Sequence, residues 1–148
     1  LDELQPFAKS HGVRIALENV MKTPFFVNLG LDNYGPDYIG ICYDSGHGNF
    51  LKDSGLAWLE PRKERLIALH LHDNDGASDQ HNIPFTGRVD WDRLMRIIAE
   101  SPYDKAVNLE CAIHKTGLAT ETDFLVKSLE AAKKIEAMIE KAKPKTSA

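Results

Sequence analysis

The sequence predicts an α/β fold in which parallel strands alternate with helices. Short runs rich in apolar and β-branched residues, at positions 13–17, 38–43, 66–69 and 106–109, have the length and composition of buried strands. Segments with apolar residues at helical spacing lie between most of these runs. Strands that alternate with helices in this way pair in parallel through right-handed crossovers. We therefore expect one opening helix followed by four βα units.

The first helices are predicted from residue spacing and from residues that interrupt helices. Apolar spacing near residues 4–8 predicts the opening helix, and Gly12 can end it because glycine readily adopts the left-handed closing conformation. Residues 21–36 contain two prolines and two glycines, which predict a loop with a short helix around 25–31. A second short helix is expected at 51–59.

The last two helices have clearer boundaries. Asp90 or Trp91 should begin a helix that ends near Pro102, because the residue before a proline disfavours the helical conformation. Thr120 should cap the final helix, since its hydroxyl can accept a hydrogen bond from a backbone N–H of the first turn. One face of this helix is apolar and is expected to be core; it consists of Phe124, Leu125, Leu129, Ala132, Ile135 and Ile139.

Each of the four predicted strands ends in a residue that can bind a metal. These residues are Glu18, Asp44, His70 and Glu110. The carboxyl ends of parallel strands meet at one edge of a sheet or one mouth of a barrel, which is where such folds build their sites. Carboxylates and imidazoles together suit a divalent cation. The pattern therefore predicts a metal centre formed by all four strand ends.

The segment after the third strand is also rich in potential ligands. His72, Asp79 and His81 are candidates for an additional metal or for residues that support the first ligands, and the alternative is a polar loop with hydrogen-bonded histidines. His11 and His114 are interpreted as helix-end and loop histidines rather than ligands.

Composition indicates an ordinary globular domain. The 148 residues are 43% hydrophobic and 27% charged. The net charge of -4 and the pI near 5.8 give no indication of the overall positive charge that is typical of nucleic-acid-binding domains. Cys42 and Cys111 both lie in apolar, strand-like runs, so we expect buried thiols in a reducing compartment such as the cytoplasm. No apolar run has the length of a membrane span. The chain begins within a helical pattern and without Met, which we interpret as a trimmed chain or part of a longer protein.

Five motifs resemble the later half of the xylose isomerase-like TIM barrel superfamily. They are ALEN with Glu18, YDSGH with Asp44 and His47, LHLHDND with His70, DQH with Asp79 and His81, and NLEC with Glu110. This superfamily contains metal-dependent sugar isomerases and epimerases, relatives of inositol-catabolism dehydratases, and endonuclease IV. The resemblance implies that residues 1–142 form a partial barrel corresponding to strands five to eight. The basic, polar composition near the end of the sequence separately predicts a flexible tail at 143–148.

The resemblance also implies the roles of individual residues. Glu18, Asp44, His70 and Glu110 would bind one divalent metal, for which Mn, Mg, Co and Zn are all suitable. Glu18 and Glu110 would transfer the proton alpha to a sugar carbonyl, and His47 would contact the substrate. The implied activity is that of a sugar or sugar-phosphate isomerase or epimerase.

Two alternatives remain open from the sequence. Asp79 and His81 match positions that bind additional zinc in endonuclease IV, so a zinc phosphodiesterase is the enzymatic alternative. The acidic composition and the HDND form of the loop favour the isomerase branch. The non-enzymatic alternative is a barrel fragment that retains its ligands but cannot turn over a substrate.

The sequence departs from the epimerase pattern in two places. Gly76 occupies a position where the epimerases have an arginine, and residues 84–91 replace a Pro-Gly-x-Gly motif; both departures argue against a ketohexose substrate. Arg88 lies in this replaced segment and could bind a substrate phosphate or carboxylate, although a solvent-exposed arginine is an equal interpretation.

Four parallel strands alone would leave two unpaired sheet edges. Such edges favour association with another chain. We therefore expect self-association, most simply a homodimer in which two half-barrels complete one barrel.

Overall fold

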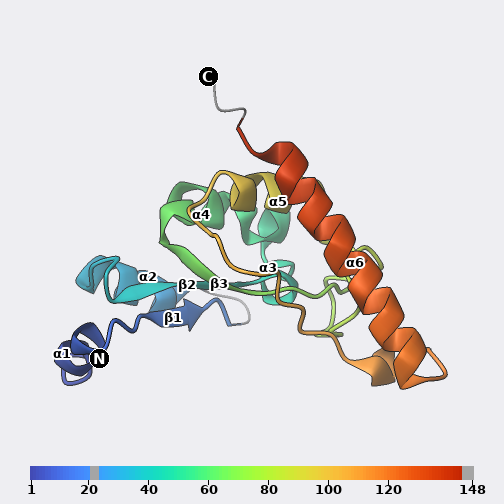
Figure 1. The fold of residues 1–148 in the computed structure, drawn as a ribbon, viewed down its shortest axis with the longest axis horizontal. Coiled ribbons are helices and arrows are strands. Elements are labelled where there is room, and N and C mark those ends of the chain that lie inside the picture. Colours follow the sequence, from blue (N-terminus) through green and yellow to red (C-terminus); the bar gives the residue numbers. More distant parts are fainter. Residues whose placement is uncertain (21–23, 145–148) are drawn as a thin grey trace.

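The computed structural model, which describes residues 1–20 and 24–144, contains a three-stranded parallel sheet (Figure 1). The strands β1 (Ile15–Glu18), β2 (Ile39–Asp44) and β3 (Leu66–His70) lie in the order β1-β2-β3. Glu18 pairs in register with Cys42, and Asp44 pairs with His70. The predicted α/β class and the parallel pairing are confirmed.

The helices occur close to their predicted places, except that one expected helix is interrupted and the short helix at Ser45–Gly48 was not predicted. They are α1 (Gln5–Ser10), α2 (Phe25–Asn33), α3 (Ser45–Gly48), α4 (Leu56–Leu59), α5 (Trp91–Ala99) and α6 (Glu121–Ala142), with 3-10 turns at Lys52–Gly55, Glu60–Arg65 and Ile113–Lys115. The helix expected at 51–59 is broken, because Asp53, Ser54 and Gly55 have φ angles of 52°, 56° and 65°. The carbonyl of Ser54 instead accepts a hydrogen bond from the buried Tyr43 hydroxyl.

The predicted start of α5 at Asp90 or Trp91 and the predicted Thr120 cap of α6 are confirmed. The Asp90 carboxylate accepts a hydrogen bond from Arg93 N at 3.0 Å, and the Thr120 hydroxyl accepts one from Asp123 N at 3.0 Å. Both interactions satisfy N–H groups that have no partner within the helix. The tail predicted at 143–148 lies mostly outside the described residues.

The fourth strand, expected at 106–109, is not confirmed as a strand. Within the described chain it forms an isolated parallel bridge between Leu71 and Leu109, with hydrogen bonds of 3.0 Å from Leu71 N to Asn108 O and from Glu110 N to Leu71 O. The Asn108 side-chain amide donates to Leu69 O at 3.0 Å. In a regular parallel ladder, a backbone N–H would bind this carbonyl instead. The bridge nevertheless places Glu110 beside the end of β3.

The core lies between the sheet and the helices α4 and α5. Ile41 and Leu66 of the sheet pack with Leu56 of α4 and Leu94 of α5, and all four side chains are almost completely buried. Burial of this apolar surface is the main favourable contribution to folding. The core thus holds β2 and β3, whose ends carry Asp44 and His70.

The apolar face of α6 is core only in part. Ile135 is fully buried against α5, whereas Leu125 and Leu129 are 64% and 55% exposed. Figure 1 shows the reason: the carboxyl-terminal half of α6 lies along α5, and its amino-terminal half projects beyond the other helices. The expectation that the whole stripe is core is therefore wrong.

Candidate metal centre

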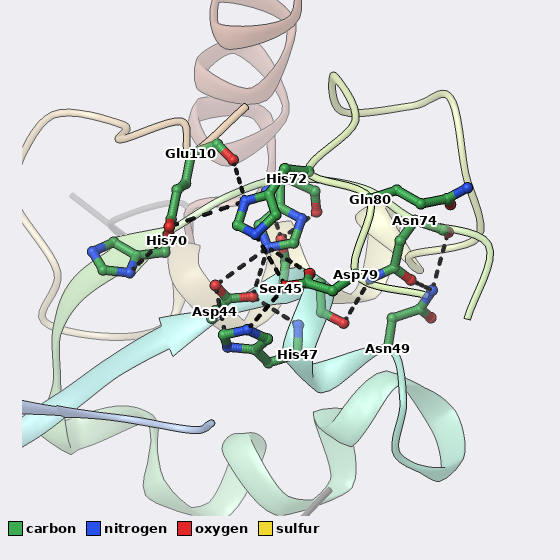
Figure 2. Close-up of polar contacts among 12 residues, drawn as sticks. Asp44, Ser45, His47, Asn49, His70, His72, Asn74, Asp79, Gln80 and Glu110 are labelled. Carbon is green, nitrogen blue, oxygen red and sulfur yellow. Dashed lines mark hydrogen bonds and ion pairs between the residues drawn. The ribbon is translucent and has the colours of Figure 1, made fainter. Parts of the chain in front are cut away.

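Potential ligands from all four segments converge at the carboxyl edge of the sheet. Figure 2 shows Asp44, His70 and Glu110 at this edge. His70 Nδ1 lies 3.2 Å from Glu18 Oε2 and 3.0 Å from Glu110 Oε2. Asp44 lies next to His70 because β2 and β3 pair at these two residues. The four residues predicted from the strand ends are therefore brought together, with Glu110 held by the bridge rather than by a strand.

The backbone at Asp44 is fixed by a residue that sequence reasoning missed. Asn19 donates from Nδ2 to Asp44 O at 2.9 Å and accepts at Oδ1 from Asp44 N at 2.8 Å. Asn19 is buried, and this reciprocal pair joins the ends of β1 and β2 beyond the last ladder contact. In the sequence, this role is indicated only by the position of Asn19, an amide residue directly after Glu18 in the ALEN motif.

His47 lies among three carboxylates. Its backbone N–H donates to Asp44 Oδ1 at 2.7 Å, which starts the short helix α3. Its Nδ1 lies 3.0 Å from Glu18 Oε1 and 3.4 Å from Asp44 Oδ2, and its Nε2 lies 3.7 Å from Asp79 Oδ2. His47 thus connects the strand-end ligands with the loop that follows β3.

The three additional candidates form a second group beside the first. His81 Nε2 lies 3.1 Å from Asp79 Oδ2, and the rings of His72 and His81 stack at 4.0 Å between centroids with 13° between planes. His72 Nε2 lies 3.1 Å from Asp44 Oδ1, which links the two groups. His81 has a φ of 50°, an uncommon conformation for a residue other than glycine.

The donor atoms are close enough to share a cation. Their ligand atoms lie within 4.8 Å of one another in each of four sets: Glu18, Asp44 and His47; Asp44, His70 and Glu110; Glu18, Cys42 and His70; and His72, Asp79 and His81. Carboxylate oxygen with imidazole nitrogen is a donor combination that suits several divalent metals. The chemistry of the residues therefore fits a divalent metal ion.

The buried pair of Asp44 and His72 shifts the pKa of both groups. Burial acts to raise the pKa of the Asp44 carboxyl, but the hydrogen bond from His72 and its charge hold that pKa below the ordinary value. Burial acts to lower the pKa of His72, and its hydrogen bond to Asp44 raises that pKa above the ordinary value. In the metal-free protein these shifts favour an imidazolium beside a carboxylate.

The loop that carries Asp79 and His81 is anchored by Asp73, another residue that was missed. The fully buried Asp73 carboxylate accepts four hydrogen bonds of 2.8–3.1 Å, from the backbone N–H groups of Asn74, Phe85 and Val89 and from the indole of Trp91. No sequence pattern distinguished this aspartate from its neighbours, because its donors lie up to 18 residues away.

Arg88 is not brought into this network. It lies exposed on the loop, where its backbone N–H donates to Asn74 O at 2.9 Å, and no described contact joins its side chain to the ligand cluster. Gly76 adopts a φ of 78°, a conformation that glycine takes without strain.

Residues 1–139 match the family model of the xylose isomerase-like TIM barrel, and the chain belongs to this family. Its arrangement of parallel strands with potential ligands at their carboxyl ends agrees with that membership.

Two curated proteins are similar to this chain over most of its length. An uncharacterized protein y4fM of Sinorhizobium fredii is 34% identical over 147 residues, covering 96% of this chain and 47% of the relative. An inosose isomerase of Halalkalibacterium halodurans is 28% identical over 123 residues, covering 74% of this chain and 43% of the relative. The chain thus spans about half the length of the curated relatives it matches.

Solved structures show the same fold. A D-tagatose 3-epimerase-like protein aligns with a TM-score of 0.72 at 23% identity, covering 95% of this chain and 53% of that protein. An L-ribulose 3-epimerase aligns with a TM-score of 0.69 at 15% identity, covering 99% of this chain and 56% of that protein. At these identities the likeness establishes the fold. Among the described helices, none has both the length and the apolar character needed to cross a membrane.

Proposed function

We propose that this chain is the part of a (β/α) barrel corresponding to strands five to eight, at residues 1–142, that carries the metal centre of a sugar or sugar-phosphate isomerase or epimerase. The observation that carries this proposal is the convergence of Glu18, Asp44, His70 and Glu110 at one edge of the sheet. The inosose isomerase and the epimerases among its relatives support the same class of reaction.

The four converging residues would hold the metal, and Mn, Mg, Co or Zn would each suit their oxygen and nitrogen donors. A bound divalent ion would polarise a sugar carbonyl, which acidifies the C–H bond of the adjacent carbon that bears the hydroxyl group.

Glu18 and Glu110 are the proposed acid and base. Each presents one oxygen to His70 Nδ1, and their side chains are 28% and 45% exposed, so both are accessible to a ligand above the sheet edge. One carboxylate would remove the proton alpha to the carbonyl; the electron pair of the broken C–H bond would form a carbon–carbon double bond, and the π electrons of the carbonyl would move onto its oxygen. The other carboxyl group would return a proton to carbon.

Substrate contacts are proposed for two further residues. His47 is close to Glu18 and Asp79, so its ring can donate to a sugar hydroxyl beside the proton-transferring carboxylate. Arg88 is exposed on the loop after β3 and is proposed to meet a phosphate or carboxylate at the rim of the site.

Proton exchange tests the proposed reaction. In D2O with added Mn²⁺ or Co²⁺, the chain should incorporate deuterium alpha to the carbonyl of a ketose or inosose, followed by NMR. Glu18→Gln and Glu110→Gln should each abolish exchange, whereas Glu130→Gln, an exposed glutamate on α6, should leave it unchanged. Absence of exchange across a broad sugar panel, in protein that binds metal, would favour a barrel fragment without activity.

The second ligand group is the observation that favours the nuclease alternative. His72, Asp79 and His81 could hold a further ion beside the first centre. A zinc phosphodiesterase should cleave DNA at abasic sites and lose this activity to a chelator. The net charge of -4 opposes binding to a phosphate backbone, so the isomerase is the preferred proposal.

Self-association is part of the proposal. Within the described chain, the edge of β1 away from β2 has no strand partner, and nearby Phe7, Phe26 and Leu29 are 65%, 70% and 52% exposed. A second copy could cover these surfaces and supply the other half of a barrel. The two free cysteines support a cytoplasmic location for such a protein.

A further inference from the structure

His72 is a completely buried histidine that the proposed metal centre does not use as a ligand. Its Nε2 lies 3.1 Å from Asp44 Oδ1 and 3.3 Å from Asp44 Oδ2, so one nitrogen faces both oxygens of this carboxylate. The next carboxylate oxygen, Asp79 Oδ1, lies 3.9 Å away. Its Nδ1 has no hydrogen-bond partner in the part of the chain that the structure describes.

Several contacts fix the position of this ring. The Ser45 hydroxyl donates to His72 O at 2.6 Å and accepts from His72 N at 2.9 Å, which joins the first residue after β2 to the second residue after β3. Gly46 leaves room for the ring, because a Cβ at this position would lie 1.9 Å from His72 Cε1. The ring of His81 stacks on the imidazole. The backbone, the neighbouring glycine and the stacked ring together hold Nε2 toward Asp44.

Asp44 in turn needs an orienting donor on its carboxylate. His47 N donates to Asp44 Oδ1 at 2.7 Å, and His47 Nδ1 lies 3.4 Å from Oδ2, so α3 supplies one backbone donor to this carboxylate. A second donor at Nε2 of His72 would fix the rotation and the direction in which the lone pairs point. Hydrogen bonds to metal-binding carboxylates commonly serve this purpose.

We propose that His72 is a positioning residue that donates from Nε2 to Asp44 and thereby orients this carboxylate for metal binding. The inference rests on the proposed metal centre and adds to it a residue that touches neither metal nor substrate. It assigns His72 the Nε2–H form in the assembled site, since only a protonated Nε2 can donate to a carboxylate.

Three substitutions of His72 separate donation from packing. The amide nitrogen of His72→Gln can reach the place of Nε2, that of His72→Asn corresponds to Nδ1, and His72→Leu offers no donor. Titration calorimetry with Mn²⁺ or Co²⁺ should show affinity reduced roughly 10–100-fold in the Asn and Leu variants. The Gln variant should stay close to wild type, as should His114→Gln at an exposed control histidine.

Two further measurements keep the proposal falsifiable. Urea unfolding of the metal-free variants reports stability, and a purely structural role predicts that metal affinity follows stability in all three. Gly46→Ala displaces the His72 ring without removing it, so this variant should weaken metal binding about as much as His72→Leu. If His72→Leu does not fold, Gly46→Ala takes its place in the comparison. In metal-free wild type, ¹⁵N NMR should show a slowly exchanging His72 Nε2–H that exchanges rapidly in Asp44→Ala.

The outcomes are distinct. The positioning role would be overturned if all His72 variants bound metal equally well, or if His72→Gln bound metal as weakly as His72→Leu. It would also be overturned if His72→Gln lost one bound ion, which would make His72 a ligand. Wild-type protein that takes up no metal would overturn the proposed function and the positioning role together.

Discussion

The indole Nε1 of Trp91 donates a hydrogen bond of 2.8 Å to Oδ2 of the buried Asp73. This bond joins the first residue of α5 to the chain just beyond β3. The intervening loop carries Asp79 and His81, so the Asp73–Trp91 bond closes the base of the segment that supplies the second ligand group.

Substitution at Asp73 should destabilise the protein strongly. Asp73→Asn places an amide donor where four N–H groups already point, and it should lower the free energy of unfolding by about 3 kcal/mol. Trp91→Phe removes one of these hydrogen bonds and should lower the free energy of unfolding by about 1–2 kcal/mol. Urea unfolding measures both. The exposed Asp104→Asn is the control, and equal stability of the two Asn variants would contradict the anchoring role.

Removing the two glutamates should remove the metal. Both Glu18 and Glu110 contact His70 Nδ1, so the double variant Glu18→Gln, Glu110→Gln leaves one carboxylate and one imidazole of the tetrad. Elemental analysis of wild type should find one divalent ion per chain that is lost from the double variant and retained in Glu130→Gln. Two or three zinc ions per wild-type chain would instead support the nuclease.

Asn19→Ala should affect both stability and metal binding. The substitution breaks the reciprocal bonds to Asp44 and leaves a buried backbone N–H and C=O without their partner, which should cost about 2–3 kcal/mol. Metal affinity should also fall, because the end of β2 is no longer tied to β1. Asn33→Ala, which removes an exposed bond to Leu29 O, should change neither quantity appreciably.

The two thiols should be unreactive at neutral pH. Burial is the largest cause that raises the pKa of Cys42 and of Cys111 to about 12, so alkylation at pH 8 should be much slower in the native protein than in urea. The thiols have lower pKa values in the unfolded chain than in the folded protein. The stabilisation that comes from keeping them protonated is therefore complete below roughly pH 8.5 and is lost as the pH rises toward 12. Unfolding of a Cys42→Ala, Cys111→Ala variant should depend less on pH in this range. Cys42 is buried, whereas Cys111 is only half-buried, so the expectation of two buried thiols holds for Cys42 alone. Rapid native alkylation of Cys42 would contradict its burial.

Self-association should depend on the apolar surface of α2. Light scattering across a dilution series should detect dimers of wild type, and Phe26→Asp should shift the population toward monomer. Asp substitution at Lys133, an exposed α6 position, is the control. A monodisperse wild-type monomer at all concentrations would exclude the completed-barrel dimer.

The sequence by itself determined the fold class and the places of the strand-end ligands. Alternating strands and helices favour parallel pairing, and parallel strands bring their carboxyl ends to one edge, so the sequence alone predicts that Glu18, Asp44 and His70 lie together. The caps at Asp90 and Thr120 were equally predictable, because a cap is made with residues three positions along the chain.

Only the tertiary structure decided which residues support those ligands and how far each element is buried. The bonds of Asn19 and His72 to Asp44 span 25 and 28 residues, and the bond of Trp91 to Asp73 spans 18. The fourth strand forms only a bridge, beside which the Asn108 side chain binds Leu69 O across 39 residues. Local periodicity carries no information about such partners. Burial of the α6 stripe likewise depends on whether another element lies opposite, which is a property of the assembled fold and not of the helix sequence.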